Sequence, residues 1–201
     1  MPHHSYTFLS NHKPNSNPLA AFSVLPPGVR FGTQDVDEDI ILLLRKHPIT
    51  NLPWIFLSLL MIGAPLVIFP LLDLGNITTF INSISVGIIP VLIVFWYVAI
   101  SGYVLLNFFF WYFNINIVTN ERILDFDFLY LLYREFSETF LTSVEEVTAR
   151  SGGLMSTIFD YGTVVVHTAG PSENIEFVHI PKPQEVVRII NRLVEQAHQD
   201  V

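Results

Sequence analysis

Two histidines on strand-like segments are the first residues of this chain whose chemistry suits a functional site. His167 lies in TVVVHT and His179 in EFVHI. Neighbouring strands could bring the two imidazoles together, and Asp160 or Glu176 could then complete a set of nitrogen and oxygen ligands for a metal ion. However, the chain has no H-x-x-x-H or H-x-E spacing of the kind that metal sites commonly show. We therefore interpret both histidines as structural residues and predict no metal site.

The sequence offers no complete set of groups for covalent catalysis. Ser151 and Ser156 flank Gly153 in SGGLMS, but the G-x-S-x-G pattern of a nucleophile elbow does not occur. The chain contains no cysteine, which excludes a thiol nucleophile and disulfide bonds. It also contains no phosphate-binding loop and no dinucleotide fingerprint. These observations predict that the protein is not an enzyme and carries no cofactor.

The charge of the chain is acidic and unevenly distributed. The formal net charge is −8, and residues 114–201 alone hold six basic and thirteen acidic side chains, a net −7. Such a field repels nucleic acid and anionic lipid headgroups, so we expect no nucleic-acid partner. Glu138, Glu145 and Glu146 are too sparse for a calcium site and are interpreted as a solvated face.

Two long apolar segments occupy the middle of the chain. Residues 53–72 carry no charge, a second apolar run covers 86–113, and Asp73 is the one charged residue between 53 and 113. Twenty helical residues reach about 30 Å, the thickness of the hydrocarbon core of a bilayer. The sequence therefore predicts a membrane protein with a two-helix transmembrane hairpin over residues 52–113, its spans at about 53–73 and 86–110.

The charges that flank the two apolar segments predict their orientation. Arg45 and Lys46 precede the first span, and Arg122 and Arg134 follow the second, whereas the connection 73–85 has no Lys or Arg. The positive-inside rule then places both termini in the cytoplasm and the connection outside. We predict a multi-pass protein of the cell membrane.

Aromatic and basic residues at the ends of the spans are predicted to be membrane-interface anchors. Trp54 opens the first span, and Trp111 and Tyr112 close the second. Their rings prefer the membrane interface, where Arg45 and Lys46 can also reach the headgroups.

The residues after the second span alternate between polar and apolar side chains. This pattern predicts a β-hairpin with its turn at residues 119–122, followed by strands near 132–138, 142–150, 163–169 and 174–180. Residues 183–199 carry a single apolar stripe at helical spacing. About six or seven short strands and a final helix predict a small β-barrel or sandwich over residues 114–199, capped by a C-terminal α-helix.

The residues before the first span divide into two segments. Residues 1–29, rich in Asn and Pro, are predicted to be a disordered leader, and residues 30–51 a juxtamembrane segment. Within the latter, Ile40–Leu44 is a run of five apolar residues. It could be a short helix or a strand that packs on the later domain, because periodicity alone does not separate the two.

Four segments in a fixed order resemble the bacterial pleckstrin-homology (PH)-like domain family, in its membrane-anchored YdbS-like form. They are YFNINIVTNERIL at 112–124, VEEVTAR at 144–150, GLMSTIFDYGTVVVHT at 153–168, and the Pro-flanked segment 181–193. The resemblance covers roughly residues 38–197. It implies a PH-like fold on a membrane anchor.

The resemblance also implies structural roles for the motif residues Thr119, Asn120, Arg122, Gly153, Tyr161 and Gly162. We expect Thr119 and Asn120 to form the turn of the first hairpin, and Gly153 and Gly162 to serve turns that start strands. Arg122 is expected to pair with a carboxylate of a neighbouring strand, Glu145 or Glu146.

Eukaryotic relatives by fold often bind phosphoinositides through a basic first hairpin. The corresponding hairpin in this chain offers Arg122 against Glu121, Asp125 and Asp127. Because a multiply charged phosphate would meet net repulsion there, we do not expect phosphoinositide binding.

The sequence thus favours a noncatalytic, membrane-anchored PH-like domain protein. Its expected partners are the lipid bilayer and either an unidentified protein or a second copy of the chain at the cytoplasmic face. The alternative is an accessory subunit of a membrane enzyme or transporter, with the chemistry supplied by a partner or by His167 and His179.

Overall fold

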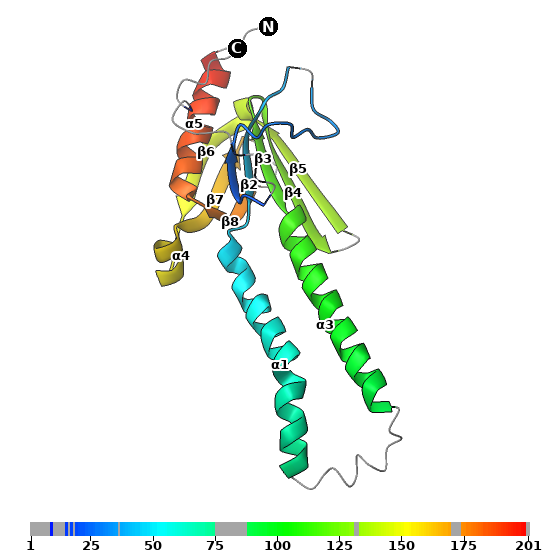
Figure 1. Cartoon of the computed structure of the whole chain (residues 1–201). Coiled ribbons are helices and arrows are strands. Elements are labelled where there is room, and N and C mark those ends of the chain that lie inside the picture. Colours follow the sequence, from blue (N-terminus) through cyan, green and yellow to red (C-terminus); the bar gives the residue numbers. More distant parts are fainter. Residues whose placement is uncertain are drawn as a thin grey trace. The chain divides into compact units, whose positions relative to one another are not determined.

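The computed structural model describes residues 9, 15, 17, 19–35, 37–74, 88–130, 133–169 and 174–199. The chain divides into two compact units, which are residues 1–49 with 111–201 and residues 50–110. The first unit contains the strands, and the second contains most of two apolar helices (Figure 1).

Five antiparallel strands form the larger sheet of the first unit, which we call sheet A. Their order is β1 (Phe22–Val24), β2 (Ile40–Arg45), β3 (Ile115–Thr119), β4 (Arg122–Tyr130) and β5 (Tyr133–Phe140). The run Ile40–Leu44 is therefore a strand. All six residues of β2 are buried, and a strand covered on both faces has a continuous rather than alternating apolar pattern. This burial explains why periodicity left its assignment open.

The predicted disordered leader is corrected by the structure at several positions. Phe22–Val24 pairs with β2 as an edge strand of sheet A. Leu9 is buried in the same hydrophobic core as Val24. Part of residues 1–29 therefore belongs to the folded domain, and it is held there by backbone pairing and apolar burial that the local composition does not reveal.

Three further strands form a second antiparallel sheet, sheet B. Its order is β6 (Val144–Arg150), β7 (Tyr161–Thr168) and β8 (Ile175–Pro181). The 3-10 helix η3 (Leu141–Ser143) connects the two sheets, and the short helix α4 (Leu154–Phe159) lies between β6 and β7. The described strands form two separate sheets, so the barrel that the sequence analysis allowed is not observed. The six strands after the second apolar helix and the C-terminal helix α5 (Pro183–Gln199) agree with the prediction.

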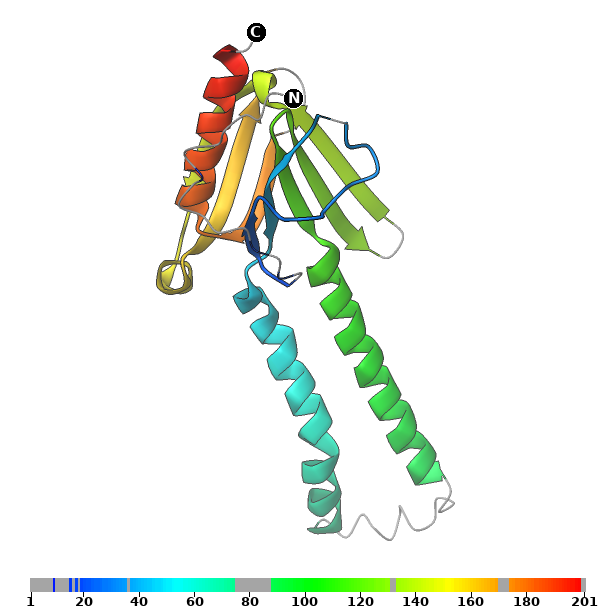
Figure 2. The same ribbon diagram turned by 45° about the horizontal axis from the view of Figure 1, so that its top comes forward.

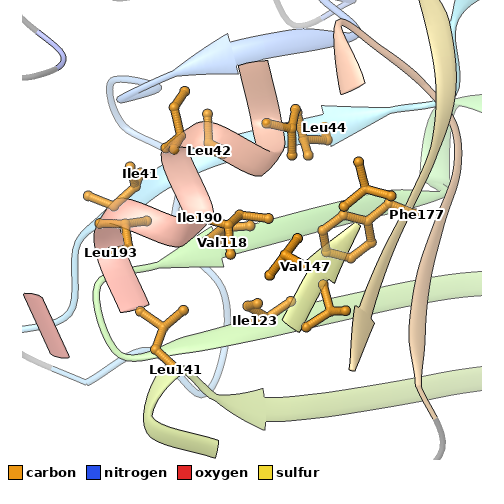
Figure 3. Close-up of a cluster of buried hydrophobic side chains, with 14 of the residues drawn as sticks. Ile41, Leu42, Leu44, Val118, Ile123, Leu141, Val147, Phe177, Ile190 and Leu193 are labelled. Atoms are coloured by element: carbon orange, nitrogen blue, oxygen red, sulfur yellow. The ribbon is translucent and has the colours of Figure 1, made fainter. Parts of the chain in front are cut away.

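The main core lies between the two sheets and α5. It contains the inward side chains of sheet A, those of sheet B, and the apolar stripe of the helix, including Val118, Val147, Phe177 and Ile190 (Figure 3). Full burial of such side chains contributes about 1.5–3 kcal/mol each. Helix α5 lies along β6 and β7, as Figure 2 shows. Its single apolar face therefore closes the core.

The opposite face of sheet A carries a smaller apolar cluster. Ile40, Ile117 and Leu124 form it, and Phe31, Ile115 and Phe126 pack against it. Phe31 comes from the loop between β1 and β2, so residues before the first apolar helix cover part of this face.

The second unit is built from two helices that are long and apolar enough to cross a membrane. Helix α1 (Leu52–Leu74) follows the 3-10 helix η2 (Pro48–Asn51), and α3 (Ile88–Phe113) leads directly into β3. The Trp96 indole donates to the Met61 carbonyl over 3.1 Å, and the Tyr97 hydroxyl donates to the Ile62 carbonyl over 3.3 Å. These hydrogen bonds join α1 and α3. The predicted outward placement of the connection concerns residues 73–85, of which 75–85 lie outside the described residues.

Candidate functional site

The two chain segments that lead into the apolar helices meet at one end of sheet A, which we call the span-side end. Strand β2 ends at Arg45 and β3 begins at Ile115, and these two residues are partners in the sheet. The Trp111 indole donates to the Lys46 carbonyl over 2.8 Å. Residues 45–46 and 111–115 are therefore fixed to each other within the first unit.

Four of the five predicted interface anchors lie at the span-side end. The Arg45 guanidinium is 4.7 Å from the centroid of the Tyr112 ring and is buried in the domain. Burial lowers the pKa of Arg45, and the neighbouring Tyr112 partly offsets this effect. Trp111 and Lys46 make the hydrogen bond described above. The fifth residue, Trp54, lies in α1 and donates from its indole to Asn51 Oδ1 over 3.1 Å.

A hollow of about 480 Å³ opens on the outer face of sheet A, next to its span-side end. Its floor comes from β2, β3 and β4 and includes Ile115, Ile117 and Phe126. Its wall comes from residues 26–31, and the remaining lining includes Tyr112. We call this cavity the sheet-A hollow. Mostly apolar cavities with a few polar groups are typical binding sites.

Sequence reasoning missed the sheet-A hollow because its wall belongs to the segment predicted as leader and juxtamembrane chain. Pro26, Pro27 and Phe31 line it, together with Arg30 and Arg45. The local sequence contains one signal that could have indicated a folded surface in this segment. Pro26 and Pro27 are followed within five positions by the aromatic residue Phe31.

Arg122, one of the residues for which a structural role was expected, holds the N-terminal segment to the first hairpin. Its Nε and one terminal nitrogen donate to the two Glu38 carboxylate oxygens over 3.0 and 2.9 Å. Glu138 and Asp35 lie farther from the guanidinium, at 3.4 and 3.9 Å. The expected partners Glu145 and Glu146 are therefore wrong, because β6, which carries them, belongs to the other sheet.

Glu38 is a buried carboxylate whose charge is stabilised by several donors. It is 2 % exposed, and Thr119 Oγ1 donates to it over 2.8 Å in addition to Arg122. Burial alone would raise the pKa of Glu38. The hydrogen bonds from Arg122, Thr119 and the Asp35 backbone outweigh burial and lower it below its ordinary value.

Thr119 and Asn120 form the turn between β3 and β4, as expected. Thr119 Oγ1 accepts hydrogen bonds from the backbone N–H groups of Glu121 and Arg122 over 3.2 and 3.0 Å. Asn120 Oδ1 accepts from the backbone N–H of Asp39 over 2.8 Å. The turn therefore also binds the segment that leads into β2, a role that local sequence does not reveal.

The structure does not bring the two candidate histidines together. His167 is paired with Glu146 near one end of β7. His179 lies in a bulge of β8 opposite Thr163, with a φ of 56°. Thr163, which lies opposite His179, and His167 are four positions apart on β7. The two histidines are therefore separated by about 13 Å along the strand direction. Among the described residues, no three His, Cys, Asp or Glu side chains gather as metal ligands.

His179 belongs instead to a small aromatic cluster at the span-side end. The Tyr161 ring stacks on His47 with centroids 5.6 Å apart and lies 5.8 Å from the His179 ring. The His47 backbone N–H donates to the His179 carbonyl over 2.7 Å. Burial lowers the pKa of His47, and the charge of Asp160 partly offsets this shift. The cluster ties the last residues before the first apolar helix to sheet B.

The two motif glycines have different roles. Gly153 has a φ of 98° and precedes α4, so it supplies a conformation that other residues rarely adopt. Gly162 is the second residue of β7, and a Cβ there would lie 2.7 Å from the Arg150 carbonyl oxygen. A close backbone approach, rather than the expected turn, requires glycine at position 162. Ser156 donates to the Gly153 carbonyl over 2.7 Å, a local bond within the α4 turn.

Comparisons with protein-family models, with curated proteins and with solved structures each returned no match for this chain.

Proposed function

We propose that the protein is a noncatalytic, membrane-anchored domain of PH-like type that binds a partner protein at the cytoplasmic face of the membrane. In this proposal α1 and α3 are the two spans, and the sheet-A hollow is the site where an apolar side chain of the partner docks. A second copy of the chain is one candidate for that partner.

The pairing of β2 with β3 is the observation that carries the membrane part of the proposal. Strand β2 precedes α1 in the chain, and β3 follows α3. Strands of one sheet must lie in one compartment, so any membrane crossings of the chain between them must be even in number. Two apolar helices of 23 and 26 residues fit two crossings. Two antiparallel sheets with a C-terminal helix also agree with a PH-like type.

The sheet-A hollow and the edge of β5 support the binding part of the proposal. The hollow offers an apolar floor, and Arg30 stands at its wall. Strand β5 is the last strand of sheet A, so one of its edges has no partner strand among the described residues. An unpaired edge can receive an extended segment of another chain.

Site-specific photo-crosslinking in native membranes tests this function. A photoreactive residue replaces Val29 in the hollow wall, and the matched control replaces the exposed Glu176 of β8 in sheet B. The proposal predicts a discrete crosslinked product at position 29 and none at position 176. Native mass spectrometry from mild detergent should show the corresponding complex. A partner-free monomer without a crosslink at position 29 would contradict the proposal.

The rival view, an enzyme or transporter subunit that uses its histidines, is distinguished by a double variant. Alanine at His167 and His179 should leave the crosslinked complex and the cellular phenotype unchanged. Loss of phenotype with retained folding and retained crosslinking would favour the rival.

A further inference from the structure

Helix α4 exposes a group of large apolar side chains on the surface of the domain. Leu154 is 83 % exposed, Met155 60 %, Ile158 69 % and Phe159 42 %. The helix has the sequence LMSTIF and carries no charge. Exposed apolar groups of this kind on a folded domain mark a contact surface, because water contact with such side chains is unfavourable.

The position of α4 within the first unit connects this surface to the membrane. Phe159 lies two residues before Tyr161, whose ring stacks on His47. His47 in turn precedes the start of α1 by five residues, a stretch that spans at most about 18 Å. Figure 1 shows α4 at the end of sheet B, beyond the start of β7. The apolar surface therefore lies at the end of sheet B that contacts His47, near the point where the chain leaves the domain.

We propose that α4 inserts its apolar side chains into the lipid surface, as an additional membrane contact of the domain. Short amphipathic segments at membrane interfaces bury apolar side chains at the boundary between headgroups and acyl chains. This inference rests on the proposed membrane anchor and is independent of the proposed protein partner.

The charges near α4 fit a lipid surface. Lys46 precedes His47, and the backbone N–H of Lys182 donates to the carbonyl of Asp160, the residue that follows α4. The Lys182 ammonium is 3.2 Å from the Glu185 carboxylate and 5.4 Å from the centroid of the Phe22 ring, so Lys182 and Glu185 neutralise each other within the domain, and Lys46 offsets the charge of Asp160. The local charge is therefore balanced, although the domain as a whole is acidic.

Fluorescent labelling of single-cysteine variants tests the contact. The chain has no cysteine, so Ile158→Cys, Glu195→Cys and Leu60→Cys each give one label position in the full-length protein. Each variant carries an environment-sensitive dye and is reconstituted in phosphatidylcholine vesicles with phosphatidylglycerol. Spin-labelled lipid then quenches dyes in the bilayer, and iodide quenches dyes in water.

The proposal predicts blue-shifted emission at position 158, loss of most of that emission to spin-labelled lipid, and protection from iodide. The label at 195 on α5 should show the opposite behaviour, and the label at 60 in α1 should behave as a membrane residue.

If iodide quenches the label at position 158 as strongly as the label at 195, while spin-labelled lipid quenches the label at 60, the proposed α4 contact is wrong and the membrane anchor is retained. If iodide quenches the label at position 60, α1 does not lie in the bilayer and the proposed membrane anchor is wrong. The blue shift at position 158 could instead depend on protein density and be unaffected by spin-labelled lipid. That result would mean that a second copy of the chain covers the α4 surface, and it would overturn the proposal.

Discussion

At the residue scale, an ion pair with a buried carboxylate connects two segments of the domain that are far apart in sequence. Glu38 and Arg122 join the segment before the first apolar helix to the first hairpin, 84 positions apart in sequence. A buried carboxylate is stable only when donors surround it, and here Thr119 and the Asp35 backbone complete the set. The pair therefore helps to place the N-terminal segment, together with the strand pairing of β1 and β2.

Glu38→Gln should lower the free energy of unfolding by about 2 kcal/mol, since it leaves Arg122 without its principal counter-ion. The loss stays moderate because Glu138 and Asp35 remain near the guanidinium. Thermal unfolding in detergent, followed by circular dichroism, measures the change. Glu145→Gln on β6 is the control and should change stability little; equal effects of the two variants would contradict the assigned pairing.

Glu38 should also make stability fall at acidic pH. Its pKa is lower in the folded than in the unfolded state, so its stabilisation is complete above the unfolded value near 4.3. It is then lost as the pH falls through the folded pKa. Unfolding measured from pH 6 to pH 3 should show a steeper loss for the natural protein than for Glu38→Gln. Parallel curves would mean that another carboxylate is responsible.

His47 should contribute a separate dependence in the neutral range. Burial lowers its pKa in the folded state, so the unfolded chain binds more protons as the pH falls below about 6.5. Stability from this group is present above that value and decreases on acidification. His47→Phe keeps a ring against Tyr161 and removes the titration. The variant should lose less stability than the natural protein between pH 7.5 and 5.5, and an identical loss would exclude His47 as the source.

At the element scale, the sequence predicted those strands and helices whose polar and apolar residues follow a regular pattern along the whole element. Helix α5 covers residues 183–199, as its single apolar stripe indicated, because it buries only one face. The strands of the first hairpin were predicted from their alternation of polar and apolar residues, although β3 is buried on both faces. Strand β2 was left open and β1 was missed, because both depend on partners distant in sequence. The two sheets do not close into a barrel in the part of the chain that the structure describes.

The candidate site was less accessible to prediction than the fold. The disfavoured possibility that His167 and His179 share one site does not agree with the strand register, which residue spacing does not report and which separates the two residues. The sheet-A hollow was missed because its wall comes from residues 26–31, ahead of the strands that form its floor. The α4 surface was missed because Gly153 was expected to serve a turn that starts a strand, and no helix was predicted over residues 154–159.

The close packing of β7 against its neighbours gives a prediction at this scale. A Cβ at Gly162 would lie 2.7 Å from the Arg150 carbonyl oxygen and 3.1 Å from Pro183, at the start of α5. Gly162→Ala should therefore destabilise the domain by about 1–3 kcal/mol, because backbone atoms would have to move. Gly152→Ala, with open space around its Cβ, is the control and should change stability by less than about 0.5 kcal/mol. Thermal unfolding compares them, and equal effects would contradict the close approach.

At the scale of the whole molecule, the chain folds one domain from segments on both sides of a helical insertion. Residues 50–110 form a separate unit, while the strands before and after it pair in sheet A. Because these strands pair in one sheet, both flanking segments must share a compartment. Lys and Arg are absent from residues 73–85 and present on both flanks, and this charge pattern is the basis for the proposed cytoplasmic orientation.

The central claim is that two helices span the membrane and that the domain lies in the cytoplasm. Labelling of single cysteines in intact cells tests this claim most directly. Asp37→Cys, Ser83→Cys and Glu195→Cys place one thiol before the first span, in the connection and in α5 of a chain without natural cysteine. A membrane-impermeant maleimide should label position 83 in intact cells and positions 37 and 195 only after the membrane is opened. Labelling of 37 and 195 on opposite sides, or equal labelling of all three before lysis, would contradict the account.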